Sequence, residues 1–570
     1  MAEEVKKRIS IGAEDLKNIV QRNGYYVDKT PMIKELIDSN SAVTLLTRPR
    51  RFGKTLNQSM LRRFFEDERT ETGETIDNRW VFNDLAVSTY GNAYLQHQQK
   101  YPVINLSMKS GKQPAFELAY ENLKEELRGE FYRHRYILEN GTLNDRLKQP
   151  FEAILTGKGE ALEYSRALRI LSECLQSYHG EKAIILIDEY DVPLENAYFQ
   201  GFYDEMSSFI RALFESALKT NDCVEFAVIT GCLRISKESI FTGLNNLEVN
   251  STMSPHYADA FGFTEQEVQD LLAYYDLREN FTQVKEWYDG YRFGSKEIYN
   301  PWSILSYVRN AEVAPGYLPR PYWSNTSSNS IVKELVVNAD KTARTDIEEL
   351  LDGRTIEKPV HEEVTYADIS GSQDNLWNFL YFTGYLKAVS EELRGDQLYM
   401  RLAIPNRELR SIFKNTVQEW FNDTIKKADL SPLRAALEQG DCAALGSFIS
   451  EKLMETISYF DYDERFYHGF LTGMLTGMGG YDVLSNRESG EGRPDIILKE
   501  QKFCGRAFLI EVKVADSFPQ MQARCQEALR QIEDQKYEAD LLSEGYQISQ
   551  KYGLCFFRKG CIAMADKDCD

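Results

Sequence analysis

The first half of the chain alternates short apolar runs with amphipathic stretches. The apolar runs are residues 42–46, 100–108, 183–191 and 224–231. Each has the length of one strand, and runs that are apolar throughout are typical of parallel strands buried on both faces. Helical patterns separate them, most extensively at 115–175. The pattern therefore predicts a doubly wound α/β domain.

Capping residues and turn residues place the ends of several helices. Thr30 is expected to cap a helix over 31–38 that begins with Pro31, and Gly180 to end the long helical region. Thr264, with Glu267 three residues later, forms a capping-box pattern. A helical region with dense aromatic residues and glycines follows, including 287–294 and 298–302, and we expect it to form a lid over the first domain.

The second half divides into two further regions. Residues 331–440 combine helical patterns with a strand pair at 385–389 and 397–404, and a winged-helix-like fold is expected there. Residues 441–570 combine a helix over 461–478 with strands at 493–498 and 507–514. Three glycines of that helix are expected to let it approach a sheet closely: Gly469, Gly473 and Gly477. The predicted domains are 1–262, 263–330, 331–440 and 441–570, the last with an α/β fold.

Composition narrows the class of protein. A chain of 570 residues with 42% hydrophobic and 27% charged residues fits a folded protein of several domains. No apolar run reaches the ~18–20 residues of a membrane span, and the N-terminus lacks a signal core. Nine scattered cysteines without a C-x-x-C pair fit reduced thiols, so a cytoplasmic location is expected. The net charge of −21 repels nucleic acid unless a local basic patch or a bound metal ion offsets it.

The stretch 48–55 (Arg-Pro-Arg-Arg-Phe-Gly-Lys-Thr) follows the first strand and precedes a helix over 56–65. This order is what a phosphate-binding P-loop requires. Gly53 lets the backbone approach a phosphate, Lys54 would reach the β- and γ-phosphates, and the Thr55 hydroxyl would complete a Mg²⁺ shell. Arg48 stands where the motif normally has its first glycine.

The run 183–191 ends in acidic residues, as a Walker B strand does. Asp188 would hold Mg²⁺ through water, and Glu189 would polarise the attacking water. Thr230 ends the next strand, where a polar residue senses the γ-phosphate in NTPases that have a strand between the two Walker strands. Arg234 is a candidate phosphate or interface arginine, although an arginine in a loop is more often a surface residue.

Four other residues are candidates for contacts with ATP. Tyr26 and Val27 precede the P-loop strand and either wall the adenine or pack in the core. Arg50 and Arg51 are candidate phosphate or interface cations, with surface exposure as the alternative.

The last 130 residues carry a second set of chemical groups. Period-two geometry puts Glu511 and Lys513 on one strand face, and a hairpin with the preceding strand would bring Asp495 beside Glu511. Two carboxylates suit Mg²⁺ or Mn²⁺, and the lysine can orient or deprotonate a water. Glu464, on the preceding helix, and Gln531, on the following one, complete a PD-(D/E)XK pattern.

These motifs together resemble a large prokaryotic family that joins an AAA-like ATPase domain to a C-terminal PD-(D/E)XK nuclease-like domain. The matching stretches are 26–30, 48–55, 186–191, 241–246, 287–291 and the nuclease set. An arginine at position 48 is typical of this family. The resemblance implies that residues 441–570 form an α/β restriction-endonuclease-like domain. It also implies that Asp495 and Glu511 are metal ligands, that Lys513 is the catalytic lysine, and that Glu464 and Gln531 support the metal site.

The leading hypothesis is an ATP-binding switch or motor that controls a metal-dependent nuclease acting on nucleic acid. One alternative is a regulatory ATPase whose nuclease fold only binds nucleic acid or a partner protein, which the net negative charge of residues 441–570 favours. A nucleotide sensor that does not hydrolyse ATP is a further alternative, and Glu189 argues against it. Self-assembly into homo-oligomers stays open.

Overall fold

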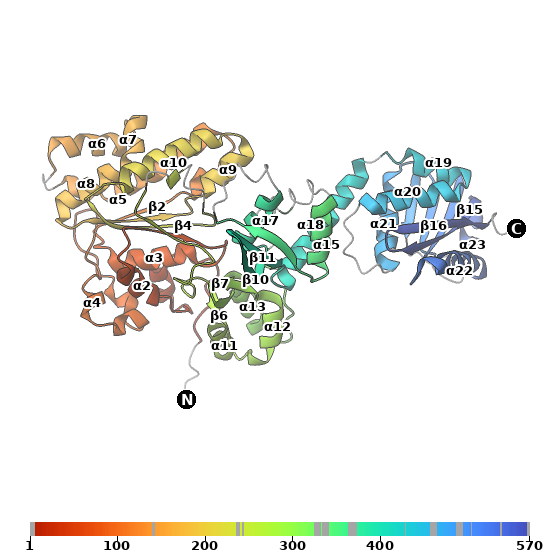
Figure 1. Ribbon diagram of the computed structural model, residues 1–570, viewed down its shortest axis with the longest axis horizontal. Helices are drawn as coiled ribbons and strands as arrows, with labels where there is room; N and C mark the ends of the chain where they lie inside the picture. The colour runs from red at the N-terminus through yellow and green to blue at the C-terminus, as the bar shows by residue number, and fades with distance from the viewer. Residues whose placement is uncertain are drawn as a thin grey trace. The chain divides into compact units, whose positions relative to one another are not determined.

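The computed structural model describes residues 6–139, 143–234, 240–241, 244–323, 332, 341–362, 373–427, 429–455, 464–485, 494–502, 504–535 and 538–566 (Figure 1). The chain forms two compact units, one of residues 1–328 and 355–412 and the other of 329–354 and 413–570. The predicted lid lies in the first unit, whereas residues 331–440 are divided between the two. The four-domain division stays a prediction. Residues 242–243 of the stretch 241–246 and residues 461–463 of the predicted helix 461–478 lie outside the described ranges.

A five-stranded parallel sheet forms the centre of the first unit. Its order is β2-β3-β4-β1-β5, so β4 lies between β1 and β3. The predicted parallel α/β sheet is confirmed, and every residue of β1 and β3 is buried, as their apolar runs indicate. The strands are β1 (Val43–Thr47), β2 (Val103–Ser107), β3 (Ala183–Asp188), β4 (Val224–Gly231) and β5 (Leu247–Asn250).

Helices cover both faces of this sheet. In Figure 1, α2, α3 and α4 lie on one face, and α5 to α10 lie on the other. The predicted helical region 115–175 is confirmed as four separate helices, and α8 ends at Gly180 with φ 71°. The bounds are α1 (Leu16–Gln21), α2 (Pro31–Ser39), α3 (Lys54–Phe65), α4 (Asn92–Leu95), α5 (Phe116–Arg133), α6 (Asp145–Leu155), α7 (Ala161–Ser165), α8 (Ala167–His179), α9 (Val192–Gln200) and α10 (Tyr203–Leu218).

The predicted cap at Thr30 is wrong. The Thr30 side chain makes no capping bond to α2; its hydroxyl donates to Asp28 (2.6 Å) and accepts from the backbone N–H of Val87 (3.1 Å). Pro31 begins the helix without an N–H that needs a partner, so the hydroxyl is available for these other bonds.

Residues 263–313, which belong to the predicted lid and are here called the lid region, combine helices with a small antiparallel sheet of order β6-β8-β7. The capping box of Thr264 and Glu267 is confirmed at the start of α11. Tyr25 and Val27 pack against the apolar cluster of this region. The elements are β6 (Phe263–Thr264), α11 (Glu265–Tyr274), α12 (Phe281–Tyr288), β7 (Tyr291–Phe293), β8 (Lys296–Tyr299) and α13 (Pro301–Val313).

A three-stranded antiparallel sheet of order β10-β11-β9, here called the middle sheet, completes the first unit. The predicted strand pair is confirmed as β10 (Lys387–Arg394) and β11 (Gln397–Ala403), and β9 (Ile356–Val360) adds a strand that the sequence pattern did not reveal. Helix α17 (Gln373–Phe382) precedes β10, and α18 (Arg407–Lys427) follows β11. The winged-helix assignment stays a prediction.

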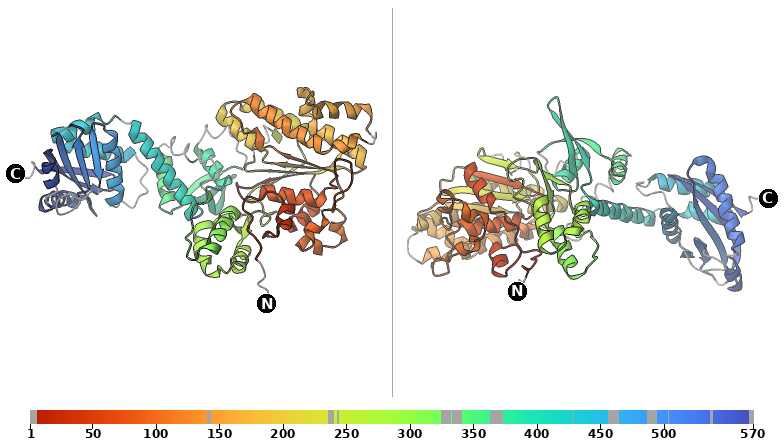
Figure 2. Two further views of the ribbon diagram at one scale, coloured as in Figure 1. Left: turned by 180° about the vertical axis from the view of Figure 1, so that it is seen from behind. Right: turned by 90° about the horizontal axis from the view of Figure 1, so that it is seen from below.

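The second unit centres on a mixed sheet of order β12-β13-β14-β15-β16. α19, α20 and α21 contribute to the apolar core on one face, and α22 and α23 pack on the other (Figure 2). The predicted hairpin is confirmed as β13 paired with β14. The elements are α15 (Lys341–Leu351), α19 (Ser431–Gln439), α20 (Cys442–Glu455), α21 (Glu464–Gly477), β12 (Tyr481–Ser485), β13 (Ile496–Glu500), β14 (Arg506–Val514), α22 (Met521–Asp534), α23 (Ala539–Ser543), β15 (Gln547–Phe557) and β16 (Gly560–Ala565).

The expectation for the glycines of α21 is wrong. Gly469 and Gly473 are exposed, and a Cβ added at either would meet nothing within 4 Å. The helix packs instead through the face that carries Tyr467, Leu471 and Met474. Large apolar residues fill the contact with the sheet, so close backbone approach is not what these glycines provide.

Within the described ranges, every helix falls short of the length and apolar content that crossing a membrane would require.

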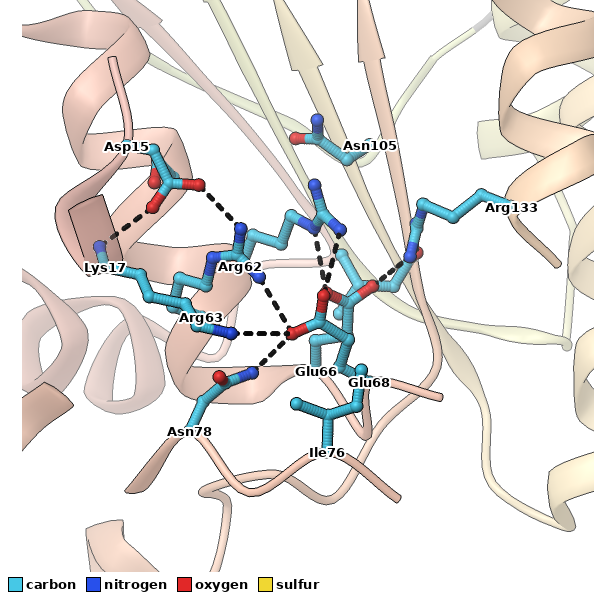
Figure 3. A network of polar contacts seen from close by, with 12 residues as sticks. Asp15, Lys17, Arg62, Arg63, Glu66, Glu68, Ile76, Asn78, Asn105 and Arg133 are labelled. Carbon is cyan, nitrogen blue, oxygen red and sulfur yellow. Dashed lines mark hydrogen bonds and ion pairs between the residues drawn. The ribbon is translucent and has the colours of Figure 1, made fainter. Parts of the chain in front are cut away.

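A buried ionic network ties the C-terminal end of α3 to β2 and α5 (Figure 3). Arg133 pairs with both Glu66 and Glu130, and Glu130 also accepts the backbone N–H of Asn105 at 2.7 Å. Burial by itself would raise the pKa of Glu130, but Arg133 and the neighbouring His134 outweigh it and hold that pKa well below its usual range. The ionised carboxylate therefore stabilises the fold at neutral pH.

Replacing Glu130 by Gln should lower the free energy of unfolding by about 3 kcal/mol at pH 7, because Arg133 loses a buried partner. Since the folded-state pKa of Glu130 is depressed, its contribution is present above the ordinary pKa of a glutamate and is lost as the pH falls through the folded value. The difference between wild type and variant should thus shrink below about pH 4. Denaturant unfolding at several pH values measures it.

Glu125→Gln is the matched control on the same helix, because Glu125 is exposed and pairs only at the surface with Arg128. Its effect should stay below about 0.5 kcal/mol. Equal destabilisation by the two changes would contradict the role given to the network.

Candidate nucleotide and nuclease sites

The loop between β1 and α3 places a lysine and a threonine at the first turn of a helix. Gly53 caps α3 with φ 88°, a conformation that a residue with a Cβ rarely adopts, and a Cβ there would meet nothing within 4 Å. The Lys54 ammonium donates to the backbone carbonyls of Arg48 (2.8 Å) and Pro49 (2.9 Å). The helix start thus opens onto free space beside a buried cation, as an anion site requires.

Two hydroxyls, one from the first turn of α3 and one from the end of β4, meet at the carboxylate that ends β3. Asp188, the last residue of β3, accepts the hydroxyl of Thr55 at 2.6 Å and also the hydroxyl of Thr230 from β4. The position of β4 between β1 and β3 is the arrangement in which a residue such as Thr230 reads the γ-phosphate. The structure therefore brings together three of the residues chosen from sequence.

Glu189 lies next to this cluster in an uncommon backbone conformation. Its φ is 53°, in the left-handed region that non-glycine residues seldom occupy. Burial and the adjacent Asp188 raise the pKa of its carboxyl. A carboxylate whose proton affinity is raised, at the end of the acidic strand, has the properties of a general base.

Arg48 does not face the phosphate position. Its guanidinium is wholly buried and donates to four carbonyls: those of Thr47, Asn250, His256 and Tyr257. It also stacks over Phe261 and Phe293, 5.3 and 5.2 Å from the ring centroids. Burial lowers its pKa to about 9. The arginine that replaces the first glycine therefore joins the end of β1 to the end of β5 and the segment after it.

The other arginines considered from sequence have different surroundings. Arg50 forms an ion pair with Glu195 on α9, and Nη1 of Arg234 lies 3.2 Å from Oε2 of Glu362. Arg51 is exposed, and its guanidinium lies 4.2 Å from the ring centroid of Trp302. Their roles toward a nucleotide stay predictions.

An apolar pocket adjoins the start of α3. Tyr26 and Val27 line it, and Gly53 connects it to the P-loop. Both residues also pack against apolar clusters of the first unit, so the two sequence interpretations of them stay predictions. Tyr26 is held by its hydroxyl, 3.5 Å from the Met60 sulfur. Phe52 and Leu56, on either side of Gly53, also line it. Sequence reasoning missed the walls that come from a distant segment, among them Phe263, Pro301 and Leu305.

Sequence reasoning also missed Asp191 as a residue of the nucleotide site. Its buried carboxylate accepts the backbone N–H groups of Cys232 (2.7 Å) and Leu233 (2.9 Å), and burial raises its pKa to about 6. The hydroxyl of Tyr190 donates to the Leu233 carbonyl at 2.7 Å. Tyr190 and Asp191 thus fix the loop that follows Thr230. Their presence directly after Asp188 and Glu189 was the sequence signal that could have identified them.

In the second unit, Asp495, Glu511 and Lys513 come together on β13 and β14. The backbone N–H of Val512 donates to the Asp495 carboxylate at 2.8 Å, and that of Asp495 lies 3.4 Å from Glu511 Oε2. Lys513 Nζ lies 3.2 Å from Glu511 Oε1. Burial and the adjacent Asp495 raise the pKa of Glu511 to about 7. The two close carboxylates are the oxygen ligands that a divalent cation prefers, and the lysine lies beside them.

The other nuclease candidates differ in their placement. Glu464 is exposed at the first residue of α21, and among the described residues no group of three or more His, Cys, Asp or Glu side chains could hold a metal ion. Gln531 lies on α22, the helix over the Glu511 face of the sheet. His468, which we did not foresee here, has Nε2 2.8 Å from the Asp495 carbonyl oxygen and so fixes the backbone of that residue.

Comparison with known proteins places both sites in families. Residues 10–241 match the family model described as "Predicted AAA-ATPase", and residues 462–565 match that of the "PD-(D/E)XK nuclease superfamily". The chain therefore joins an AAA-ATPase-like domain to a PD-(D/E)XK nuclease-like domain, which confirms the architecture predicted from the motifs.

One full-length relative has the same span. The protein named "Uncharacterized protein in vnfD 5'region" from Azotobacter chroococcum mcd 1 is 24% identical over 563 residues, which cover 95% of each chain.

Arg48→Lys should destabilise the chain by about 3 kcal/mol, because one ammonium cannot satisfy carbonyls from three segments. Thermal unfolding without nucleotide measures this effect. An arginine that served only as a phosphate ligand would give the opposite pattern, with unchanged unfolding and weakened nucleotide binding, and that result would refute the structural role.

Proposed function

We propose that the first unit binds and hydrolyses ATP and that the second unit cleaves phosphodiester bonds of nucleic acid with the help of Mg²⁺ or Mn²⁺. The observation that carries the ATPase proposal is the meeting of Thr55 and Thr230 on Asp188. Two polar residues from the ends of β3 and β4 converge on a third in the first turn of α3, where the fold leaves free space above Gly53.

The residues present fit a nucleoside triphosphate with Mg²⁺. The backbone N–H groups at the start of α3 and the Lys54 ammonium would bind the phosphates, and the pocket of Tyr26 and Phe52 would receive the base. Thr55 and Asp188 supply hard oxygen atoms for Mg²⁺, which when bound neutralises phosphate charge. Glu189 would take the proton of the attacking water, and Thr230 would orient Asp188.

The second unit fits a hydrolytic nuclease site. Asp495 and Glu511 offer carboxylate oxygens at the open end of the β13–β14 hairpin. Burial and the adjacent Asp495 raise the pKa of Glu511, as expected where a cation belongs between two carboxylates. Such a cation, when bound, would stabilise charge on the scissile phosphate. Lys513 would orient a water for attack, with His468 keeping Asp495 in place.

We propose that ATP binding and hydrolysis control the nuclease-like domain. The alternative is that this domain only binds nucleic acid or a partner protein. It is favoured by the finding that, in the part of the chain that the structure describes, no third acidic ligand joins Asp495 and Glu511. Cleavage assays separate the two functions.

Lys54→Ala should abolish ATP binding, and Glu189→Gln should retain binding but lower kcat for ATP by about 10²-fold, because only the proton acceptor is lost. Lys100→Ala is the control, since Lys100 precedes β2 at the opposite edge of the sheet and pairs at the surface with Glu181. Phosphate release and nucleotide titration measure the two effects. Normal ATP hydrolysis by Lys54→Ala would show that the P-loop assignment is wrong.

Lys513→Met and Asp495→Asn should each lower metal-dependent cleavage of DNA or RNA by at least about 10²-fold. Lys502→Met, in the exposed turn of the same hairpin, is the control and should cleave like wild type. Single- and double-stranded substrates are tested with Mg²⁺ and Mn²⁺, with and without ATP. If wild type cleaves none of them but binds them, the binding alternative replaces the nuclease proposal.

A further inference from the structure

The aromatic and glycine-rich segment 287–294 has no part in either proposed reaction, yet it lies directly beneath the P-loop. The ring of Phe52 contacts Tyr291 and Phe293, with centroids 4.9 and 5.2 Å apart. The same Phe293 lies under the guanidinium of Arg48. All three aromatic rings are buried. The P-loop therefore rests on β7.

The turn between α17 and β10 reaches the P-loop from the middle sheet. Gly384, with φ 87°, is in contact with Pro49: a Cβ at position 384 would lie 2.8 Å from Cβ and 3.0 Å from Cγ of Pro49. It would also lie 3.4 Å from Tyr291. Any larger residue must displace the proline ring, so this close approach requires glycine.

Pro49 connects this turn with the lysine of the nucleotide site. Its carbonyl oxygen accepts the Lys54 ammonium at 2.9 Å, while its ring lies against Gly384. A movement of Lys54 toward a phosphate would release that carbonyl. A movement of Pro49 would in turn alter the contact with the turn.

The end of the middle sheet is attached to the same segment. A Cβ at Gly290 would lie 2.3 Å from the carbonyl oxygen of Pro405, and Asn406 donates its side-chain amide to the Asp289 carbonyl at 2.7 Å. Pro405 and Asn406 directly precede α18. Both ends of the β10–β11 hairpin therefore meet the support of the P-loop.

We propose that Tyr291, Phe293 and Gly384 form a seat for the P-loop, and that this seat couples nucleotide binding to the middle sheet. These are positioning residues, which act through Pro49 and Phe52. The inference rests on the proposed ATP site and names the element that responds to it. Because coupling between two sites is reciprocal, a change at Gly384 must alter nucleotide affinity, and nucleotide must alter the turn.

Gly384→Ala tests the first half of this reciprocity. Binding of the fluorescent analogue mant-ATP with Mg²⁺ to the full chain should weaken roughly tenfold, because the added methyl group displaces Pro49. Gly395→Ala is the matched control: Gly395 lies in the β10–β11 turn with φ 61°, and a Cβ there would meet nothing within 4 Å. It imposes a similar backbone strain without touching the P-loop, and its affinity should match wild type.

Pro49→Gly provides a second variant that removes the ring that the methyl group would strike. In that background, Gly384→Ala should change affinity by less than about threefold, because the two effects are not additive when the residues are in contact. Circular dichroism and thermal unfolding confirm that each variant is folded. If Gly384→Ala changes the affinity equally in wild type and in Pro49→Gly, the proposal that these residues form a seat for the P-loop is wrong.

Hydrogen exchange tests the second half in wild-type protein. ATP should change the exchange of the Gly384 and Tyr385 amides, which bond to Tyr381 and Leu380 in this turn, and should leave them unchanged in Pro49→Gly. If wild type binds ATP and these amides do not respond, the coupling is refuted. If wild type does not bind ATP at all, the proposed function itself fails, and the two failures are thus distinct.

Discussion

The first unit depends on one carboxylate. Asp188 ends the acidic strand β3. Thr230 reaches it from the neighbouring strand β4, and Thr55 reaches it from the first turn of α3, which follows β1 on the far side of β4. This contact fixes the first turn of α3 relative to the sheet. It is also why the residues that would bind a triphosphate and its cation are already assembled in the fold.

Arg48 provides a second constraint on the conformation of the P-loop. Its four carbonyl bonds join the P-loop strand to β5 and to the segment at 256–257. The same region places Phe52 on β7 and Pro49 on Gly384. A P-loop that lacks its first glycine therefore receives its shape from packing against the lid and the middle sheet, and this dependence links its conformation to theirs.

The sequence predicted features that depend on neighbours along the chain. The apolar runs identified four of the five parallel strands, and the alternation in 507–514 placed Glu511 and Lys513 on one face of β14. The confirmed hairpin then required only that two adjacent strands pair, which brings Asp495 to Glu511.

Features that depend on distant contacts were beyond that reasoning. The burial of Arg48 requires carbonyls some 200 residues away, and the pocket walls come from the lid. The cap at Thr30 failed because Asp28 and Val87 engage its hydroxyl. The glycines of α21 misled because small residues are equally compatible with an exposed helix face.

A structure of the chain with Mg²⁺ and a non-hydrolysable ATP analogue tests the central claim most directly. The account predicts phosphates at the start of α3, Lys54 turned from the carbonyls of Arg48 and Pro49 to the phosphate oxygens, and the cation beside Thr55 and Asp188. Arg48 should keep its four carbonyl bonds. An analogue bound elsewhere, or an Arg48 guanidinium on the phosphates, would contradict it.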